Sequence, residues 1–358
     1  MPKLTASWPR LRKVLPAILL VMQLLAFSDI VYSDPIVDII PGEAILRIDD
    51  GDFVHPVFSP NGALLAYSKV IVENQTELTE VYLHEFSSGK TRRLLDAANS
   101  RNYATYKAFI YRLEWISNQR LRAYISDGDV DTTLVEFDVM TDSVVDTRDG
   151  DLEMDWYEKT NRWMQSVKPL PAWEPEVLRT AFENGMQLAD GSFLIQPQYS
   201  GVEANIYRLT TDGNLTLIRS AAEPSAGALG GALQFNESLL FIQSESSGGH
   251  SKRAELLRYD NDEIEILASM ATTTEPRLKP LFSNRSIALF FVSTARTYEI
   301  NPGKLYTYSA SGLTEWLAPG MLYDVVASAT NKMLALVFWQ NEHRVIEIYS
   351  VDNFIQVR

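Results

Sequence analysis

One turn-and-strand pattern returns at intervals along this chain. Its clearest copy runs from His55 to Tyr67, where Ser59-Pro60-Asn61-Gly62 separates two apolar strands, and Ser88-Gly89 forms a later turn of the same unit. Weaker copies follow toward the C-terminus. Repeats of about 40–50 residues, each a run of short strands, are typical of proteins in which every repeat forms one four-stranded blade. The sequence therefore predicts an all-β fold, a β-propeller.

The repeats can be counted from their turns and apolar strands. Six units of four strands fit best, and they lie near residues 53–95, 111–147, 188–219, 232–267, 280–317 and 323–357. Two segments compete for the strand that closes the ring. Glu43 to Ile48 precedes the first unit and is strand-like, while Phe354 to Val357 ends the last unit. The sequence leaves this choice open.

Residues 1–33 have the pattern of a secretory signal peptide, followed by an N-terminal segment at 34–52. Basic residues lie between Lys3 and Lys13, an apolar run from Val14 to Phe27 follows, and small residues favour cleavage after Ser33 or Ser28. The apolar run is short for a membrane span, which needs about 20 residues. We expect a periplasmic or secreted protein with no stable membrane insertion after cleavage, with retention of the segment as an anchor left open.

Composition excludes several classes of site. The chain has 358 residues and no cysteine, which excludes disulfides, thiol nucleophiles and thiolate metal ligands. Its formal net charge is −14 at pH 7. An acidic protein of this kind repels nucleic acids and anionic lipids. We therefore expect no nucleic-acid partner.

The first unit also carries a resemblance to a known family. Phe58-Ser59-Pro60-Asn61-Gly62 with Leu65-Ala66-Tyr67, followed by Val81-Tyr82-Leu83 and Ser88-Gly89-Lys90, resembles the repeat of TolB-like (WD40-like) propellers. The resemblance spans 53–358 and is best in the first and fifth units. It implies a six-bladed propeller in the bacterial cell envelope that acts mainly as a protein-binding platform, here without the α/β domain that precedes the propeller in TolB.

Residues 151–180 interrupt the strand rhythm and indicate an insertion. This segment contains Trp156, Tyr157, Trp163 and Trp173, together with several prolines. Large aromatic side chains that project from a rigid scaffold are typical of protein-binding surfaces. The four residues are therefore a candidate surface for an envelope protein or peptide. The alternative is that the rings fold back and cover the core of the third unit.

No complete catalytic motif is present. The four histidines do not lie at metal-ligand spacing, and a Gly-x-Ser-x-Gly elbow is absent. We expect a non-catalytic binding protein with no catalytic residue, metal or cofactor. Two alternatives remain: a metal-dependent hydrolase or lyase with carboxylates such as Glu114, Glu237 and Asp324 in the channel, and a carbohydrate-binding propeller that uses its tryptophans.

Overall fold

The computed structural model divides the chain into Met1–Ile36 and Val37–Arg358, and only the second unit contains described residues. These are residues 37–39, 42–73, 76–103, 108–126, 132–150, 152–197, 205–220, 227–244, 253–272, 276–293, 303–316, 318, 320–330 and 332–357. The predicted signal peptide therefore lies outside the described residues. Within the described ranges, no helix has both the length and the apolar character needed to cross a bilayer.

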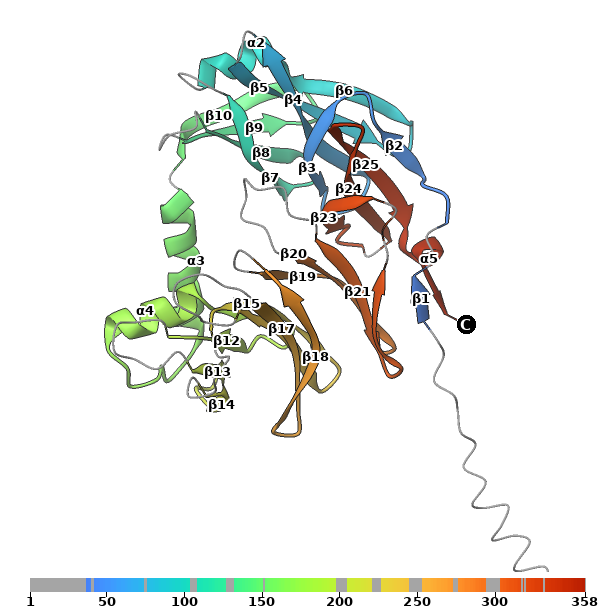
Figure 1. The fold of residues 1–358 in the computed structure, drawn as a ribbon. Helices are drawn as coiled ribbons and strands as arrows, with labels where there is room; N and C mark the ends of the chain where they lie inside the picture. The colour runs from blue at the N-terminus through green and yellow to red at the C-terminus, as the bar shows by residue number, and fades with distance from the viewer. Residues whose placement is uncertain are drawn as a thin grey trace, which may run out of the picture. The chain divides into compact units, whose positions relative to one another are not determined.

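The strands form six four-stranded antiparallel sheets, and the chain is a six-bladed β-propeller, as predicted (Figure 1). Blade 1 contains β3 (Asp52–Phe58), β4 (Leu64–Glu73), β5 (Thr76–Glu85) and β6 (Lys90–Leu95). Blade 2 contains β7 (Phe109–Ser117), β8 (Arg120–Ser126), β9 (Thr132–Asp138) and β10 (Ser143–Gly150). Blade 3 contains β11 (Met186–Gln187), β12 (Phe193–Ile195), β13 (Ile206–Leu209) and β14 (Leu215–Arg219).

The remaining blades follow the same order. Blade 4 contains β15 (Leu229–Phe235), β16 (Ser238–Ser244), β17 (Arg253–Asp260) and β18 (Glu263–Ala271). Blade 5 contains β19 (Arg277–Ser283), β20 (Ile287–Ser293), β21 (Lys304–Ser309) and β22 (Gly312–Trp316). Blade 6 contains β23 (Met321–Ala327), β24 (Met333–Gln340), β25 (His343–Ser350) and β2 (Leu46–Ile48). Short helical turns, α2 (Ala97–Ser100) and η2 (Arg101–Tyr103), connect blades 1 and 2.

The outer strand of blade 6 comes from the N-terminal side of the chain. Strand β2 pairs antiparallel with β25, with Leu46 opposite Ile348 and Ile48 opposite Ile346. The C-terminal segment lies elsewhere, because β26 (Ile355–Val357) follows α5 (Val351–Phe354) and pairs with β1 (Val37–Ile39) in a separate two-stranded sheet. Of the two segments that the sequence left open, the N-terminal one therefore completes the last blade.

The recurring turn owes its shape to short polar side chains that bind the backbone. In blade 1, Oδ1 of Asn61 accepts from the backbone N–H of Ala63 at 3.1 Å, and Oγ of Ser59 accepts from that of Leu64 at 3.0 Å. Gly62 supplies the positive φ, +70°, that the turn requires. In blade 5, Asn284 takes the same role and accepts from Ile287 at 3.0 Å. Side-chain oxygens of this kind favour turns over continued strand.

Apolar cores lie between neighbouring blades rather than within one of them. Clusters of buried side chains join blades 1 and 2, 3 and 4, 4 and 5, 5 and 6, and 6 and 1. Leu121, Ala123 and Ile125 of β8 belong to the first of these clusters. Because side chains alternate along a strand, each blade presents one face to the blade before it and one to the blade after it.

The insertion before blade 3 is helical and covers one face of that blade. It contains α3 (Leu152–Ser166) and α4 (Pro175–Glu183). Ala181 and Phe182 of α4 form a buried cluster with Phe193 and Ile195 of β12, whereas Leu194 packs toward blade 4. The helices therefore cover the face of blade 3 that points away from blade 4. In each of the other blades, the equivalent face packs on the preceding blade.

The face of blade 2 that points away from blade 1 is polar. Arg122 and Tyr124 alternate with the buried residues of β8 and so point away from blade 1. Arg122 pairs with Glu136 at 2.6 Å, and the hydroxyl of Tyr124 donates to Glu114 at 2.9 Å. Such ion pairs do not pack against an apolar sheet. The junction between blades 2 and 3 thus differs in chemistry from the five apolar ones.

Candidate functional site

A cavity of 780 Å³ lies among the innermost strands of all six blades. Its lining includes one or more residues from each of these strands, among them Val54 (β3), Tyr111 (β7), Met186 (β11), Ala232 (β15), Lys279 (β19) and Asp324 (β23). Most of these residues lie in the first half of their strand. The cavity therefore opens near the end of the propeller where the inner strands begin.

Bulges in the inner strands turn side chains toward this cavity. The pairing of the first strand with the second is shifted in blades 1, 2, 4, 5 and 6. The residues left between paired positions are His55-Pro56, Tyr111, Ile116, Gly230, Leu281 and Tyr323. Of these, His55, Tyr111, Gly230 and Tyr323 line the cavity. A bulge adds one residue to one strand and changes the direction of its side chain. The bulges at His55, Tyr111 and Tyr323 thus provide side chains that a regular ladder would place between the blades.

His55 occupies the bulge of β3 in an unusual backbone conformation. Its φ is +54°, a region that histidine enters more readily than most residues. Burial lowers the pKa of His55 to about 4, against the opposing effect of Asp324 and with a further lowering by Arg344. The imidazole is therefore uncharged at neutral pH. An uncharged imidazole can pack or form a hydrogen bond at this position without a counter-charge.

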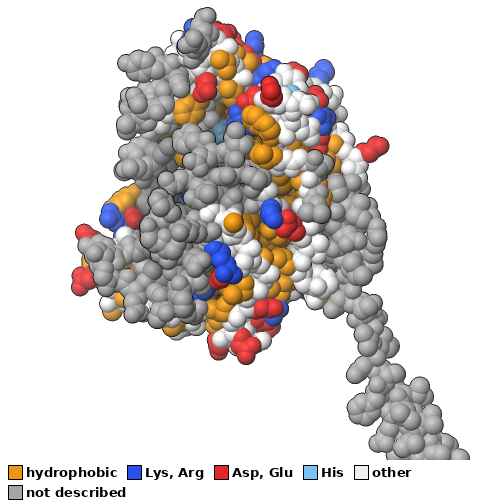
Figure 2. All heavy atoms as spheres, viewed as in Figure 1, with side chains coloured by type: hydrophobic (Ala, Val, Ile, Leu, Met, Phe, Trp, Pro, Cys, Tyr) orange, Lys and Arg blue, Asp and Glu red, His pale blue; other side chains and the backbone are white. Residues whose placement is uncertain are grey.

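Basic side chains predominate among the charged groups of the cavity. Arg112, Arg277, Lys279 and Arg344 line it, together with one carboxylate, Asp324. On the face shown in Figure 2, by contrast, acidic and basic side chains are interspersed among apolar ones. Sequence reasoning did not identify the basic residues. Only Arg112 lay within a predicted inner strand, because the predicted fifth unit begins at residue 280 and Arg344 was placed in a third strand.

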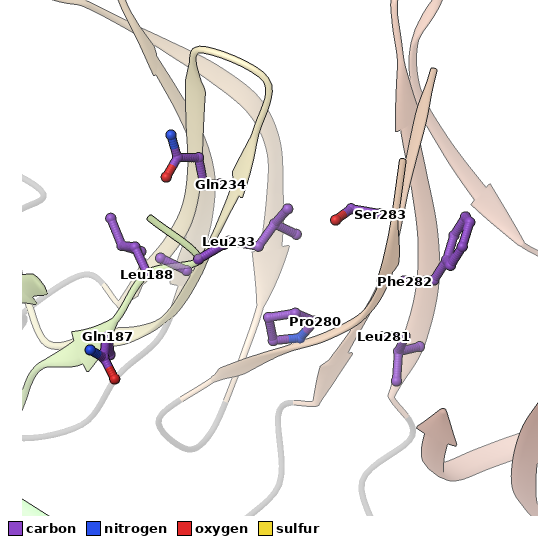
Figure 3. A pocket seen from close by; sticks show the side chains of 10 residues that line it. Gln187, Leu188, Leu233, Gln234, Pro280, Leu281, Phe282 and Ser283 are labelled. Carbon is purple, nitrogen blue, oxygen red and sulfur yellow. The ribbon is translucent and has the colours of Figure 1, made fainter. Parts of the chain in front are cut away.

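A smaller cavity of 320 Å³ continues along three of the inner strands. It shares Gln187, Ala232 and Pro280 with the larger cavity and extends to Gln234 and Ser283. In Figure 3, Leu188 and Leu233 lie across this space from Pro280 and Ser283 of β19, whereas Phe282 points to the other side of that strand. The two spaces together follow the inner strands of blades 3, 4 and 5 over most of their length.

The four aromatic residues predicted as a partner surface lie on or next to the inserted helices. Trp156 belongs to α3, and its side chain lies outside the described ones. Tyr157 is 46% exposed. Trp163 packs against Phe193 with ring centroids 5.7 Å apart, and Trp173 against Tyr207 at 5.4 Å. Trp163 and Trp173 are thus half-buried against blade 3, and the described members of the set do not line the central cavity.

The structure separates the carboxylates considered as metal ligands. Asp324 lines the cavity and pairs with Lys279, while Glu114 accepts from the hydroxyl of Tyr124 and pairs with Arg112 at 3.1 Å. Glu237 lies in the turn between β15 and β16 and does not line the cavity. In the part of the chain that the structure describes, no three His, Asp or Glu side chains are grouped as metal ligands.

Comparisons with known proteins find similarity in solved structures alone: no protein-family model and no curated protein matches the sequence. Similar structures include the β-propeller domain of the Trilobed protease from Pyrococcus furiosus, with 11% identity, a TM-score of 0.31, and coverage of 86% of this chain and 78% of that one. An acylaminoacyl peptidase from Pyrococcus horikoshii has 13% identity and a TM-score of 0.33, with 86% of this chain and 45% of the peptidase covered. TolB from Acinetobacter baumannii has 12% identity and a TM-score of 0.31, with 86% and 56% covered.

The last two of these proteins are considerably longer than the region they share with this chain. The chain spans 45% of the peptidase and 56% of TolB. The assignment of the fold rests on the six four-stranded sheets and not on these similarities.

Proposed function

We propose that this propeller is a non-catalytic binding module of the bacterial cell envelope that holds a peptide segment of a partner protein in its central cavity. The observation that carries the proposal is the 780 Å³ cavity to which all six inner strands contribute. A site built from every blade is held rigidly, because each inner strand is fixed by its own sheet. A rigid site loses little conformational entropy on binding, because its residues are already ordered.

The size and lining of the cavity suit side chains of a peptide. Binding sites commonly have volumes of about 300–1,000 Å³ and combine apolar walls with a few polar groups. Here Met186 and Val337 contribute apolar surface, Tyr111 and Tyr323 contribute aromatic rings, and Arg277 contributes charge. Such a mixed lining suits a segment in which apolar and charged side chains alternate.

The proposed envelope location rests on two features of the sequence. Residues 1–33 carry the basic, apolar and small-residue regions of a signal peptide. The repeat in the first unit resembles that of TolB-like propellers, a family of the bacterial envelope. An exported protein without cysteine also needs a large core for stability, and the five apolar clusters between blades supply one.

The inserted helices offer a second contact for the same partner. Tyr157 is exposed on α3, one residue from Trp156. Trp163 and Trp173 pack on blade 3 and hold the helices against it, so that their role is to support this surface. Aromatic residues on a firmly held element are frequent contributors to protein interfaces.

Site-specific crosslinking in the cell tests the proposal. A photoreactive p-benzoylphenylalanine replaces Tyr323 in the cavity, and in a matched variant it replaces Ile266, which is 53% exposed on β18. We expect one defined protein to be crosslinked from position 323 and not from position 266. No crosslinked protein at 323, or the same products from both positions, would contradict the proposal.

A further inference from the structure

The charge of the central cavity is opposite to that of the whole protein. The chain carries a net charge of −14, whereas the cavity lining has four basic residues and one acidic residue. A cavity with low-dielectric walls concentrates the field of its charges. Positive charge at this place, in an acidic protein, points to a ligand with a negative group.

Three of the four basic residues already have a carboxylate partner. Lys279 pairs with Asp324 at 3.0 Å. Arg344 pairs with Asp52 at 2.5 Å, and Arg112 pairs with Glu114 at 3.1 Å. The structure gives each of these cations a compensating charge, so their main effect is to shape the cavity.

Arg277 differs from the other three. It lines the cavity as the first residue of β19, its side chain is exposed, and the described part of the chain gives it no salt bridge. Lys279 lies two residues further along the same strand, and residues at this spacing share one face of a strand. The two cations therefore lie side by side, and among the described residues only Lys279 of the two has a carboxylate partner.

The chemistry of Arg277 identifies the kind of negative group. A guanidinium presents paired N–H donors in a planar fork that matches the two oxygens of a carboxylate. The nearby apolar and aromatic lining, which includes Met186, Phe291 and Tyr323, suits apolar side chains next to that carboxylate. This combination favours a peptide with an acidic group between apolar residues over a uniformly polar polyanion.

We infer that Arg277 binds a carboxylate of the peptide segment in the central cavity, from an Asp or Glu side chain or from a C-terminus. The inference rests on the proposed function, since it names the group that the proposed peptide site recognises. Arg277 would select the partner segment, and the paired cations around it would shape the space that receives that segment.

Peptide display with free and blocked C-termini tests the inference. Random dodecapeptide libraries, displayed with either a free or a fused C-terminus, are selected on the purified protein. Selected peptides are then made synthetically, and their cavity binding is checked by crosslinking to p-benzoylphenylalanine at position 323. Enrichment of Asp or Glu among peptides with a fused C-terminus would identify a side-chain carboxylate as the bound group. Binding peptides found only in the library with a free C-terminus would identify the terminal carboxylate. We expect one of these two results.

Variants then assign the carboxylate to Arg277. Arg277→Gln is expected to weaken peptide binding about tenfold to a hundredfold, the range for a hydrogen bond to a charged group. Arg277→Lys is expected to restore part of the affinity, because it keeps the charge and loses the fork. Arg148→Gln removes the same charge from an exposed residue of β10 and is expected to leave binding unchanged. Amidation of the peptide carboxylate is expected to match the loss in Arg277→Gln.

The failures of the inference and of the proposed function are distinguishable. Peptides that crosslink in the cavity without an acidic preference, and bind equally well to the Arg277→Gln variant, would overturn the inference and leave the peptide site intact. If neither library yields a peptide that crosslinks at position 323, the proposed peptide site fails and the inference fails with it. Binding of glucuronate or inorganic phosphate, in the absence of peptide binding, would contradict both.

Discussion

Arg344 and Asp52 form a two-pronged salt bridge that joins the last blade to the first. Nε of Arg344 donates to Oδ1 of Asp52 at 2.7 Å, and Nη2 donates to Oδ2 at 2.5 Å. The backbone N–H of Arg344 also donates to Oδ1 at 2.9 Å. Asp52 begins β3, and Arg344 lies near the start of β25 and lines the cavity. This pair thus joins the last blade to the first and also fixes the position of a side chain that lines the cavity.

Loss of this carboxylate is expected to destabilise the ring. Asp52→Asn leaves the partly buried guanidinium of Arg344 without its counter-charge and should lower the free energy of unfolding by about 1–3 kcal/mol. Urea denaturation of the purified protein measures the change. Asp50→Asn is the control, because Asp50 is 80% exposed with its partner Lys69 at 3.7 Å, and should change stability by less than about 0.5 kcal/mol. Equal effects of the two substitutions would show that the salt bridge contributes nothing specific.

His55 makes stability dependent on pH on the acidic side. Its pKa of about 4 lies below the ordinary value of 6.5, so the unfolded chain takes up a proton first as the pH falls. The free energy of unfolding should therefore decrease between about pH 6.5 and pH 4, by up to about 2 kcal/mol at pH 5. In His55→Asn, whose side chain tolerates the same backbone conformation, the loss between pH 7.5 and 5 should be smaller.

Burial also lowers the pKa of His84, so the pH dependence of the wild type contains contributions from both histidines. The contribution of His55 is the difference between wild type and His55→Asn in the stability lost between pH 7.5 and 5, measured by urea denaturation. An identical loss of stability in both proteins on acidification would contradict the assigned role of His55.

The contact between the inserted helices and blade 3 is expected to contribute strongly to stability. Phe182 is 0% exposed and packs against Phe193 with ring centroids 5.5 Å apart. Phe182→Ala leaves a cavity between α4 and β12 and should cost about 3–5 kcal/mol. Calorimetric or urea unfolding measures this change. A cost below about 1 kcal/mol would mean that the helices are only loosely attached.

Tyr157→Ala separates a binding role of α3 from its structural role. Because Tyr157 is 46% exposed, its loss should change the free energy of unfolding by less than about 0.5 kcal/mol. The same substitution should reduce the yield of the partner crosslinked from position 323, if α3 contacts that partner. Unchanged crosslinking would remove Tyr157 from the proposed surface.

Gly230 is required because two inner strands approach each other closely. A Cβ atom built on Gly230 would lie 1.9 Å from the carbonyl oxygen of Pro276, which belongs to the chain entering β19. Gly230→Ala should therefore separate β15 from β19 and lower the melting temperature by several degrees, as expected for a loss of about 1–3 kcal/mol. Gly320→Ala is the control, since its nearest contact is at 3.7 Å, and should leave the melting temperature nearly unchanged.

The mature N-terminus provides a direct test of the predicted export signal. Intact-mass measurement of protein purified from the periplasm should show a chain that begins at Asp34 or at Asp29, after cleavage behind Ser33 or Ser28. A protein that retains Met1 and stays with the membrane fraction would instead identify the segment as an anchor.

The blades were predictable from sequence because each one carries its own local signals. The side chains of Asn61 and Asn284 bind nearby backbone groups in their turns, and these groups are adjacent in sequence. Alternating apolar residues then mark the strands on either side. Such information requires no knowledge of distant contacts, and the predicted fold class is confirmed.

The insertion at 151–180 was predicted from sequence, but its helical structure was not. Val177, Leu178, Ala181 and Phe182 recur at the spacing of one helix face and are buried, a signal that the sequence does contain. Trp163 and Trp173 are apolar enough for a core and large enough for an interface, so the sequence alone leaves both roles open.

The cationic cavity depends on contacts that no local pattern contains. Arg112 and Arg277 come from blades 2 and 5 and line the same cavity only because the inner strands converge on one space. The ion pairs of Arg344 with Asp52 and of Lys279 with Asp324, which distinguish these two cations from Arg277, likewise join residues distant in sequence. The bulges that turn side chains inward are likewise properties of strand pairing rather than of composition.

The origin of β2 has a consequence for the order in which the molecule is made. Arg47 of β2 pairs with Glu347 of β25, a residue 300 positions later in the chain. The ribosome produces β2 among the first strands. Its partner β25 is synthesised only when nearly the whole chain has been made, so β2 stays unpaired with β25 until then. Bringing such distant segments together is slow because of the entropy of loop closure. A polypeptide released early would lack β25, and β2 would then remain an unpaired strand on an unfinished ring.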